Sequence, residues 1–154
     1  MKHHLKQIAI LGMLPLLLLI HACNSDDPDE RAIRDREKIL EYLEENDLDY
    51  YELESGVFIV IEEEGIGSNP SENSTVRMSY QGYLLNGEMF DSATNVNIFL
   101  PNTVRGFRKG VVEFKRGGKG IILIPSALGY GPTGTGTVPR NSVLIFHVEI
   151  IDFT

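Results

Sequence analysis

Residues able to carry acid–base, nucleophilic or metal chemistry are scarce in this sequence of 154 residues. Three of its four histidines, at positions 3, 4 and 21, precede the single cysteine, Cys23, and only His147 lies beyond it. Side chains alternate along a strand, so we expect His147 to point away from Phe146 and Val148 into solvent. The sequence also lacks nucleophile-elbow, phosphate-loop, zinc, calcium-loop and dinucleotide motifs. Metal catalysis therefore lacks ligands, and we expect no cofactor.

An ordered series of aromatic residues stands out in the second half of the chain. It consists of Tyr80, Phe90 followed by Asp91, Val104 and Phe107 in the segment Val-Arg-Gly-Phe, Tyr130 followed by Gly131, and Phe146. These residues indicate an aromatic-rich concave face. A purely structural role in the core is a strong alternative for Phe107 and Phe146. It is a weak one for Tyr130, because its loop setting favours exposure.

The first 22 residues have the pattern of a secretion signal. A basic start is followed by an apolar run over residues 8–20, and Ala22 stands before Cys23. The run is shorter than the ~20 residues that a membrane-spanning helix needs. Residues 20–23 resemble a bacterial lipobox, in which the cysteine carries the lipid; a plain secretory signal is the alternative. We expect lipidation of Cys23 and attachment to a membrane of the bacterial cell envelope, with the outer membrane favoured and its periplasmic or surface face undecided.

Charge is unevenly distributed along the rest of the chain. Residues 23–72 carry 17 acidic against four basic side chains, a net charge of −13, whereas residues 73–154 carry five acidic against eight basic ones, a net charge of +3. The acidic half would be repelled by nucleic acid, and the basic half has no dense stripe of lysine and arginine. We therefore expect no nucleic-acid partner.

A helix is predicted over residues 29–46. Ile33, Leu40 and Leu43 recur there on one helical face, among mostly charged neighbours. This stripe could dock on the following domain, mediate self-association with a second copy, or remain on a solvated helix. The predicted organisation is thus a lipoprotein signal peptide at residues 1–22, an acidic tether and helical extension at residues 23–54, and a folded domain at residues 55–154.

From residue 56 onward the hydrophobic pattern changes to that of strands. Strands are predicted at residues 57–61, 76–85, 88–92, 121–125 and 142–153, with a short helix between residues 103 and 115. Asn86 and Gly87 predict a two-residue type I′ hairpin turn, in which both residues take a positive φ. The elements together predict an α+β domain, an antiparallel sheet of about five strands with one helix packed against it.

Four separated segments of residues 55–154 resemble, in sequence and in order, the FK506-binding-protein (FKBP) family of peptidyl-prolyl cis-trans isomerases. They are VRMSYQGYLLNGEMFDSA from Val76, VRGFRKGV from Val104, IPSALGYGPTG from Ile124 and VPRNSVLIFHVEII from Val138. The resemblance implies the family fold, a five- to six-stranded antiparallel half-barrel sheet wrapped around a short helix. Here the N-terminal helical extension would be added to it.

The resemblance also implies site residues, because Tyr80, Phe90, Asp91, Val104, Phe107, Tyr130 and Phe146 fall on the family's pocket positions. Tyr80, Phe90 and Phe146 would wall the pocket for a proline ring, above a floor formed by Phe107. The family often has tryptophan at that floor position. The backbone N–H of Val104 and the hydroxyl of Tyr130 would each bind a substrate carbonyl. Asp91 would lie near the twisted amide and orient Tyr80, and the expected catalytic residues are Asp91, Tyr130 and Phe90.

Two segments depart from the family pattern. The chain between Asp91 and Val104 is shorter than in small family members, so Val96, Ile98 or Phe99 would have to replace an aromatic residue usually found there. The loop after Tyr130 is also slightly compressed, which bears on the sequence preference around proline.

The function implied is prolyl isomerisation that assists the folding of exported proteins, whose proline-containing segments would be the partners. Rotation about an X–Pro bond breaks no bond, so an enzyme need only bind the twisted amide better than the planar one. An alternative from another class is a membrane-tethered chaperone or binding module, with motility as one role, in which isomerase activity is weak or incidental.

Overall fold

The computed structural model describes residues 27–154. The signal peptide and Cys23 lie outside these residues. The described elements are α1 (Pro28–Glu45), β1 (Tyr51–Glu52), β2 (Phe58–Glu63), β3 (Thr75–Leu84), β4 (Met89–Phe99), α2 (Arg105–Val111), β5 (Lys119–Ile124) and β6 (Leu144–Phe153), with single 3-10 turns at Leu100–Asn102 and Ser126–Leu128.

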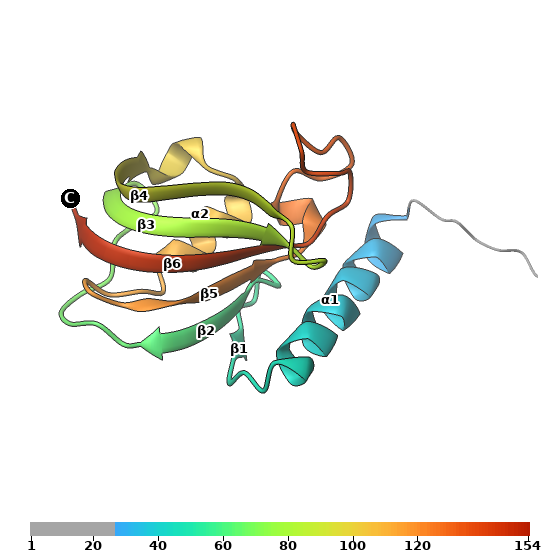
Figure 1. The fold of residues 1–154 in the computed structure, drawn as a ribbon, viewed down its shortest axis with the longest axis horizontal. Coiled ribbons are helices and arrows are strands. Elements are labelled where there is room, and N and C mark those ends of the chain that lie inside the picture. The colour runs from blue at the N-terminus through green and yellow to red at the C-terminus, as the bar shows by residue number, and fades with distance from the viewer. Residues whose placement is uncertain (1–26) are drawn as a thin grey trace, which may run out of the picture.

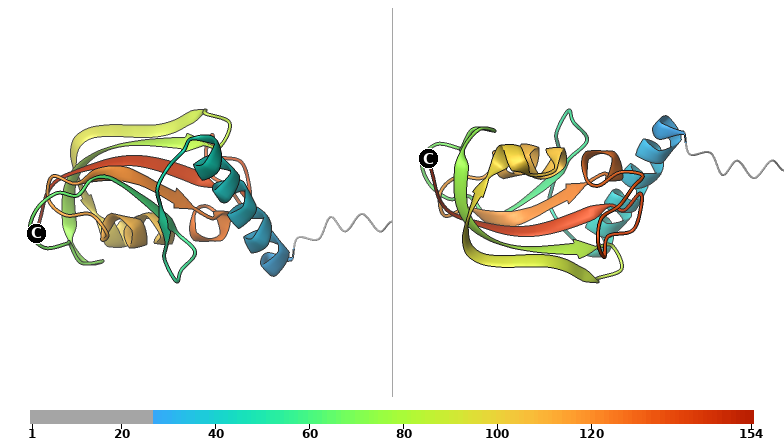
Figure 2. Two further views of the ribbon diagram at one scale, coloured as in Figure 1. Left: turned by 90° about the horizontal axis from the view of Figure 1, so that it is seen from below. Right: turned by 90° about the horizontal axis from the view of Figure 1, so that it is seen from above.

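The six strands form one antiparallel sheet in the order β1-β2-β5-β6-β3-β4. The sheet curves around α2, which lies against its concave side (Figures 1 and 2). β6 pairs with β5 on one side, through residues 144–149, and with β3 on the other, so it is one of the two central strands. The structure confirms the predicted α+β half-barrel with a helical extension and adds the short edge strand β1.

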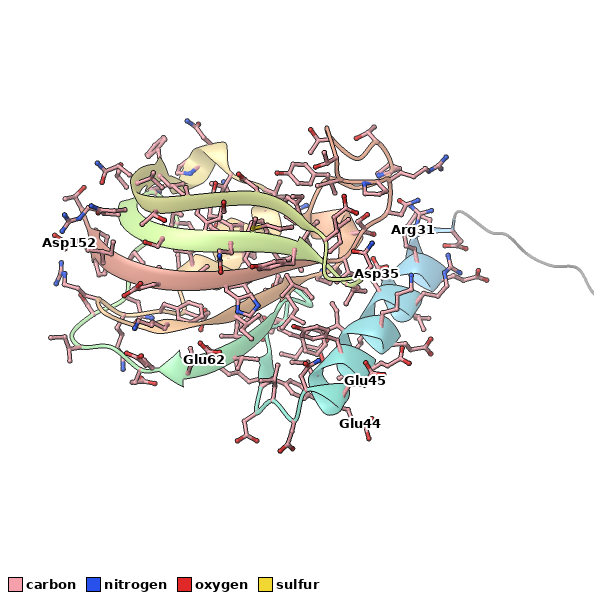
Figure 3. The ribbon with its side chains drawn as sticks, viewed as in Figure 1. Arg31, Asp35, Glu44, Glu45, Glu62 and Asp152 are labelled. Carbon is pink, nitrogen blue, oxygen red and sulfur yellow. The ribbon has the colours of Figure 1, made fainter. Side chains whose placement is uncertain are left out.

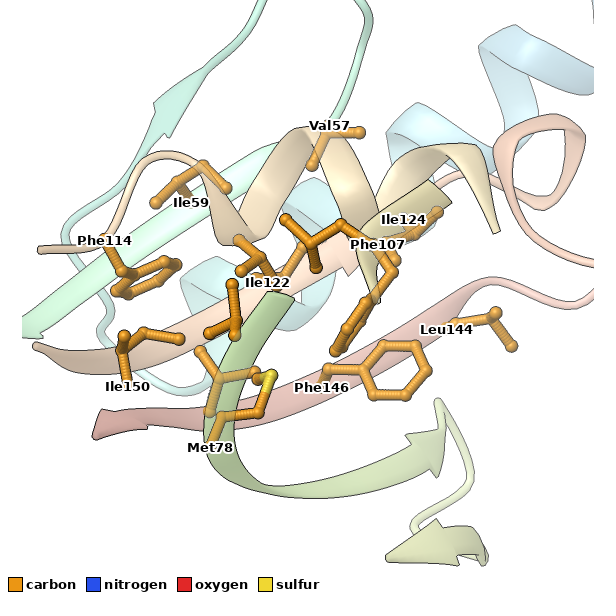
Figure 4. Close-up of a cluster of buried hydrophobic side chains, with 14 of the residues drawn as sticks. Val57, Ile59, Met78, Phe107, Phe114, Ile122, Ile124, Leu144, Phe146 and Ile150 are labelled. Carbon is orange, nitrogen blue, oxygen red and sulfur yellow. The ribbon is translucent and has the colours of Figure 1, made fainter. Parts of the chain in front are cut away.

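Alternating side chains of the sheet divide the apolar residues into two clusters. On the concave face, Leu144, Phe146 and Val148 of β6 pack with Phe107 and Val111 of α2. Figure 4 labels Leu144, Phe146 and Phe107 in this cluster. On the opposite face, the side chains of β6 and its neighbours meet α1. Each face of the sheet is therefore covered by a different helix.

The helix α1 begins with a side-chain cap, because the carboxylate of Asp27 accepts a hydrogen bond from the N–H of Asp29 at 2.9 Å. Its buried face consists of Asp35, Ile39 and Leu43, spaced four residues apart, and it docks on the outer face of the chain's own sheet. The predicted stripe was partly wrong, since Ile33 is 59% exposed. Among residues 27–154, no helix is both long and apolar enough to cross a membrane.

Two further predictions need correction. Gly87 takes a positive φ of 83° but Asn86 does not, so the β3–β4 turn is not type I′. Hydrogen bonds from the N–H of Gly87 to the carbonyl of Leu84 and from the N–H of Leu84 to the carbonyl of Glu88 fit a three-residue loop closed by a glycine. The return strand β4 also continues to Phe99, well past the predicted residue 92.

The helix α2 packs closely on β5 because two of its residues are glycines. A Cβ atom added at Gly106 would lie 2.2 Å from Ile124 Cγ2, and one added at Gly110 would lie 2.4 Å from Ile122 Cγ2. Both distances are too short for real side chains. The two glycines, one turn apart, therefore set the depth at which α2 sits in the half-barrel.

This close approach predicts the effect of Gly110→Ala. Alanine favours a helix by up to about 1 kcal/mol over glycine, but overpacking against Ile122 costs about 1–3 kcal/mol. We expect the free energy of unfolding, measured by urea denaturation, to fall by about 1–2 kcal/mol. Arg105→Ala, at the exposed start of the same helix, should stay within about 0.5 kcal/mol of wild type. An equal or higher stability of Gly110→Ala would contradict the packing argument.

Candidate functional site

A hollow of about 320 Å³ opens between the start of α2 and the β3–β4 side of the concave face. It is lined by Tyr80, Asp91, Ile98, Asn102, Thr103, Val104, Phe107, Tyr130 and Phe146. Six of the seven residues expected at the site thus share one hollow. Phe90 does not line it, although it lies directly behind one of the walls.

Three rings form the apolar part of the hollow. The ring centroids of Phe107 and Phe146 are 4.7 Å apart in an edge-to-face arrangement, and Tyr80 lies 5.9 Å from Phe107 and 6.1 Å from Phe146. Phe107 and Phe146 are only 4% and 5% exposed. Both rings therefore belong to the core and line the hollow at the same time, and the two interpretations of these residues do not exclude each other.

Phe90 supports this wall from outside. Its ring meets Phe146 edge to face at a centroid distance of 5.4 Å and an interplanar angle of 88°. The contact requires glycine on the intervening strand β3, because a Cβ at Gly82 would lie 2.7 Å from the ring of Phe90 and 2.9 Å from that of Phe146. Phe90 therefore fixes Phe146 and does not itself face the hollow.

Asp91 and Tyr80, on the paired strands β4 and β3, form the polar rim. The hydroxyl of Tyr80 donates a hydrogen bond of 2.8 Å to Oδ2 of Asp91. Burial, followed by this hydrogen bond and the charge of Asp91, raises the pKa of Tyr80 to about 12. Burial and the charge of Asp91 also raise the pKa of Tyr130. Both phenols are therefore protonated near neutral pH; the proton of Tyr80 is donated to Asp91, whereas that of Tyr130 is available to a ligand.

Two donors at the hollow have no partner within residues 27–154. Val104 caps α2 with extended dihedral angles, and its carbonyl accepts from the N–H of Arg108, but its own N–H meets no acceptor there. The hydroxyl of Tyr130 likewise makes no hydrogen bond to a described residue. A ligand with two carbonyl groups could accept from both.

The structure also shows which residue of the shortened segment, the one between Asp91 and Val104, reaches the hollow. Of the three candidates for the missing aromatic residue, Ile98 lines the hollow, whereas Phe99 is 48% exposed. Asn102 and Thr103 complete the rim, and sequence reasoning missed both. The one sequence feature that could have identified Asn102 and Thr103 is their position just before Val104, where the chain must turn to enter α2.

His147 does not line this hollow. His147 is half-buried on the outer face, where its ring meets Tyr83 edge to face at 5.6 Å, so it is less exposed than predicted. A second hollow of about 250 Å³ lies there between α1 and the sheet.

Among the described residues, no group of three or more histidine, cysteine, aspartate and glutamate side chains could hold a metal ion.

Comparison with known families identifies the class of protein. Residues 67–151 match the family model for the FKBP-type peptidyl-prolyl cis-trans isomerases. The chain belongs to this family.

Particular relatives include the FKBP-type peptidyl-prolyl cis-trans isomerase FkpA of Buchnera aphidicola, 34% identical over 103 residues, and a probable isomerase of the same type from Haemophilus influenzae, 38% identical over 104 residues. Both matches cover 64% of this chain, and they cover 41% and 43% of those relatives. The chain therefore spans about two fifths of the length of these curated relatives.

Solved structures agree on the fold. The crystal structure of FkpA from Escherichia coli superposes with a TM-score of 0.70 at 30% identity, over 82% of this chain and 62% of that one. A peptidyl-prolyl cis-trans isomerase from Pseudomonas syringae superposes with a TM-score of 0.69 at 25% identity, over 84% of this chain and 98% of that one.

The burial of Tyr80, together with its contact with Asp91, predicts a pH dependence. A tyrosine titrates near pH 10 in the unfolded chain, whereas the fold raises the pKa of Tyr80 to about 12. The hydroxyl therefore contributes stability that is complete below pH 10 and is lost as the pH rises towards 12. We expect the difference in free energy of unfolding between wild type and Tyr80→Phe to shrink across this interval. A difference that does not change with pH would contradict the assignment.

Proposed function

We propose that the chain is a peptidyl-prolyl cis-trans isomerase that acts on proline-containing segments of exported proteins and assists their folding. The observation that carries the proposal is the hollow itself. It combines a floor of packed aromatic rings with two donors that have no partner among the described residues, the N–H of Val104 and the hydroxyl of Tyr130. Membership of the isomerase family supports the same reaction.

The chemistry of this reaction suits such a site. Rotation about an X–Pro bond faces a barrier of about 18–20 kcal/mol because resonance keeps the amide planar. The twisted amide has less charge separation than the planar one, so a dry aromatic surface favours it. Each ~1.4 kcal/mol of that preference accelerates rotation about tenfold.

Different residues of the hollow would bind different parts of the substrate. Phe107, Phe146 and Tyr80 would surround the proline ring, and the two donors would hold the carbonyl groups on either side of the rotating bond. Asp91, through the 2.8 Å hydrogen bond, keeps the Tyr80 hydroxyl directed to the rim, so the Tyr80 ring keeps one orientation against Phe107. No proton transfer is required.

The alternative of a tethered binding module is not favoured. The apolar stripe predicted on the N-terminal helix favoured it, but Leu43 of that stripe is 1% exposed and packs on the chain's own sheet. The shortened segment also favoured it, but Ile98 of that segment lines the hollow.

The proposal includes lipid attachment at Cys23 to the bacterial cell envelope. Only four residues separate Cys23 from the start of α1 at Pro28. Extended chain spans at most about 3.6 Å per residue, so this tether would hold α1 within about 20 Å of the membrane. Cys23→Ser should abolish labelling by a radioactive fatty acid and move the protein out of the membrane fraction. Unchanged labelling would contradict the assignment.

The isomerase proposal is tested by a protease-free assay on a short proline peptide. Tyr130→Phe removes one neutral hydrogen bond and should lower kcat/KM about twofold to tenfold. Asp91→Ala and Phe90→Ala should lower it by more than about tenfold, because each disturbs the orientation of a wall ring.

Tyr51→Phe is the matched control. Tyr51 also donates to a carboxylate, that of Glu113 at 3.2 Å, but it lies on β1 at the far edge of the sheet. Its variant should retain wild-type kcat/KM. Wild-type rates in all three variants of the hollow would overturn the proposed site.

A further inference from the structure

The helix α1 buries a carboxylate where an apolar residue would be expected. Asp35 lies on the same face as Ile39 and Leu43, one turn from Ile39, and is 2% exposed. It is the one charged side chain that is buried in residues 27–154. Burying such a group is unfavourable unless hydrogen bonds replace those it made to water. Its presence therefore requires a specific partner.

That partner is Ser126, at the start of the turn after β5, and it is itself fully buried. Oδ2 of Asp35 accepts a hydrogen bond from the N–H of Ser126 at 2.9 Å and a second from its hydroxyl. Hydrogen bonds to a carboxylate are among the stronger ones in proteins. Both polar groups of Ser126 that can donate are thus held by the N-terminal helix.

Ser126 in turn holds the segment that carries Tyr130. Its carbonyl accepts from the N–H of Gly129 at 3.1 Å and from the N–H of Gly131 at 2.9 Å, the two residues that flank Tyr130. The chain of contacts therefore runs from Asp35 through Ser126 to the backbone on both sides of Tyr130. Tyr130, at the end of this series of contacts, lines the hollow.

A second contact holds the far end of the same loop. Nη1 of Arg31, one turn before Asp35, donates to Oδ1 of Asn141 at 2.7 Å. The N–H of Asn141 donates to the carbonyl of Gly131 at 2.8 Å. Figure 1 shows the N-terminal half of α1 beside this loop, and Figure 3 labels Arg31 and Asp35 on the helix.

We propose that Asp35 is a positioning residue for the reaction, which fixes the Tyr130 loop through Ser126. The inference rests on the proposed isomerase function. It also makes α1 part of the working enzyme, although α1 lies outside residues 67–151, the part that matches the family. A helix whose only task was to cover the sheet would not need a carboxylate at this position.

The test is a double-mutant cycle on the purified full chain. Asp35→Ala should lower kcat/KM on a short proline peptide by at most the factor for Tyr130→Phe, about twofold to tenfold. In the Tyr130→Phe background, Asp35→Ala should have almost no further effect, because the hydroxyl it positions is gone. Asp35→Asn keeps one acceptor oxygen and should recover part of the loss. Additive losses, or a wild-type rate for Asp35→Ala, would overturn the proposal.

Leu43→Ala is the control for stability. It weakens the docking of the same helix two turns further along, so it should lower the thermal midpoint yet leave kcat/KM unchanged well below that midpoint. A loss of kcat/KM in Leu43→Ala as large as in Asp35→Ala would mean that the loss in Asp35→Ala comes from general destabilisation. That result would overturn the proposal.

Amide hydrogen exchange gives a second readout of the positioning role that does not depend on catalytic activity. Asp35→Ala should speed exchange at Gly129 and Gly131 by about tenfold or more, whereas Leu43→Ala should not do so selectively. An inactive wild type would contradict the isomerase function, while this exchange would still decide whether Asp35 orders the loop. Unchanged exchange in Asp35→Ala would overturn the positioning role.

Discussion

The close approach of α2 to the concave face of the sheet is the constraint on which the site depends. Gly106 and Gly110 let the helix backbone rest directly on the side chains of β5. This depth brings the ring centroid of Phe107 to 4.7 Å from that of Phe146. It also sets the N–H of Val104, which has no partner in residues 27–154, at the hollow. A shallower helix would separate the floor of the hollow from its walls.

The two faces of the sheet support the same site in different ways. The concave face supplies the rings, and Gly82 on β3 lets Phe90 reach across to brace Phe146. The convex face carries α1, whose carboxylate at Asp35 reaches Ser126. A catalyst that breaks no bond depends on shape and orientation, so rigid support from both faces matters more than any single reactive group.

Much of this arrangement could be predicted from sequence, and the failures have physical causes. Alternation and helical spacing predicted five of the six strands and both helices, although β4 is longer than predicted. Family resemblance predicted six residues of the hollow but not Asn102 or Thr103. The choice among Val96, Ile98 and Phe99 could not be predicted. Asn95 takes a positive φ of 54° near a register shift between β3 and β4, which interrupts the alternation that would assign their faces. The buried face of α1 was misassigned because it includes a carboxylate.

The central claim is that a prolyl peptide turns inside the aromatic hollow, and nuclear magnetic resonance tests it most directly. We would record exchange between the cis and trans forms of a short proline peptide while following the backbone amides of the protein. The account predicts accelerated exchange, with the amide shifts changing at Val104 and around Tyr130. Unaccelerated exchange, or shifts confined to the outer face around Tyr83 and His147, would contradict it.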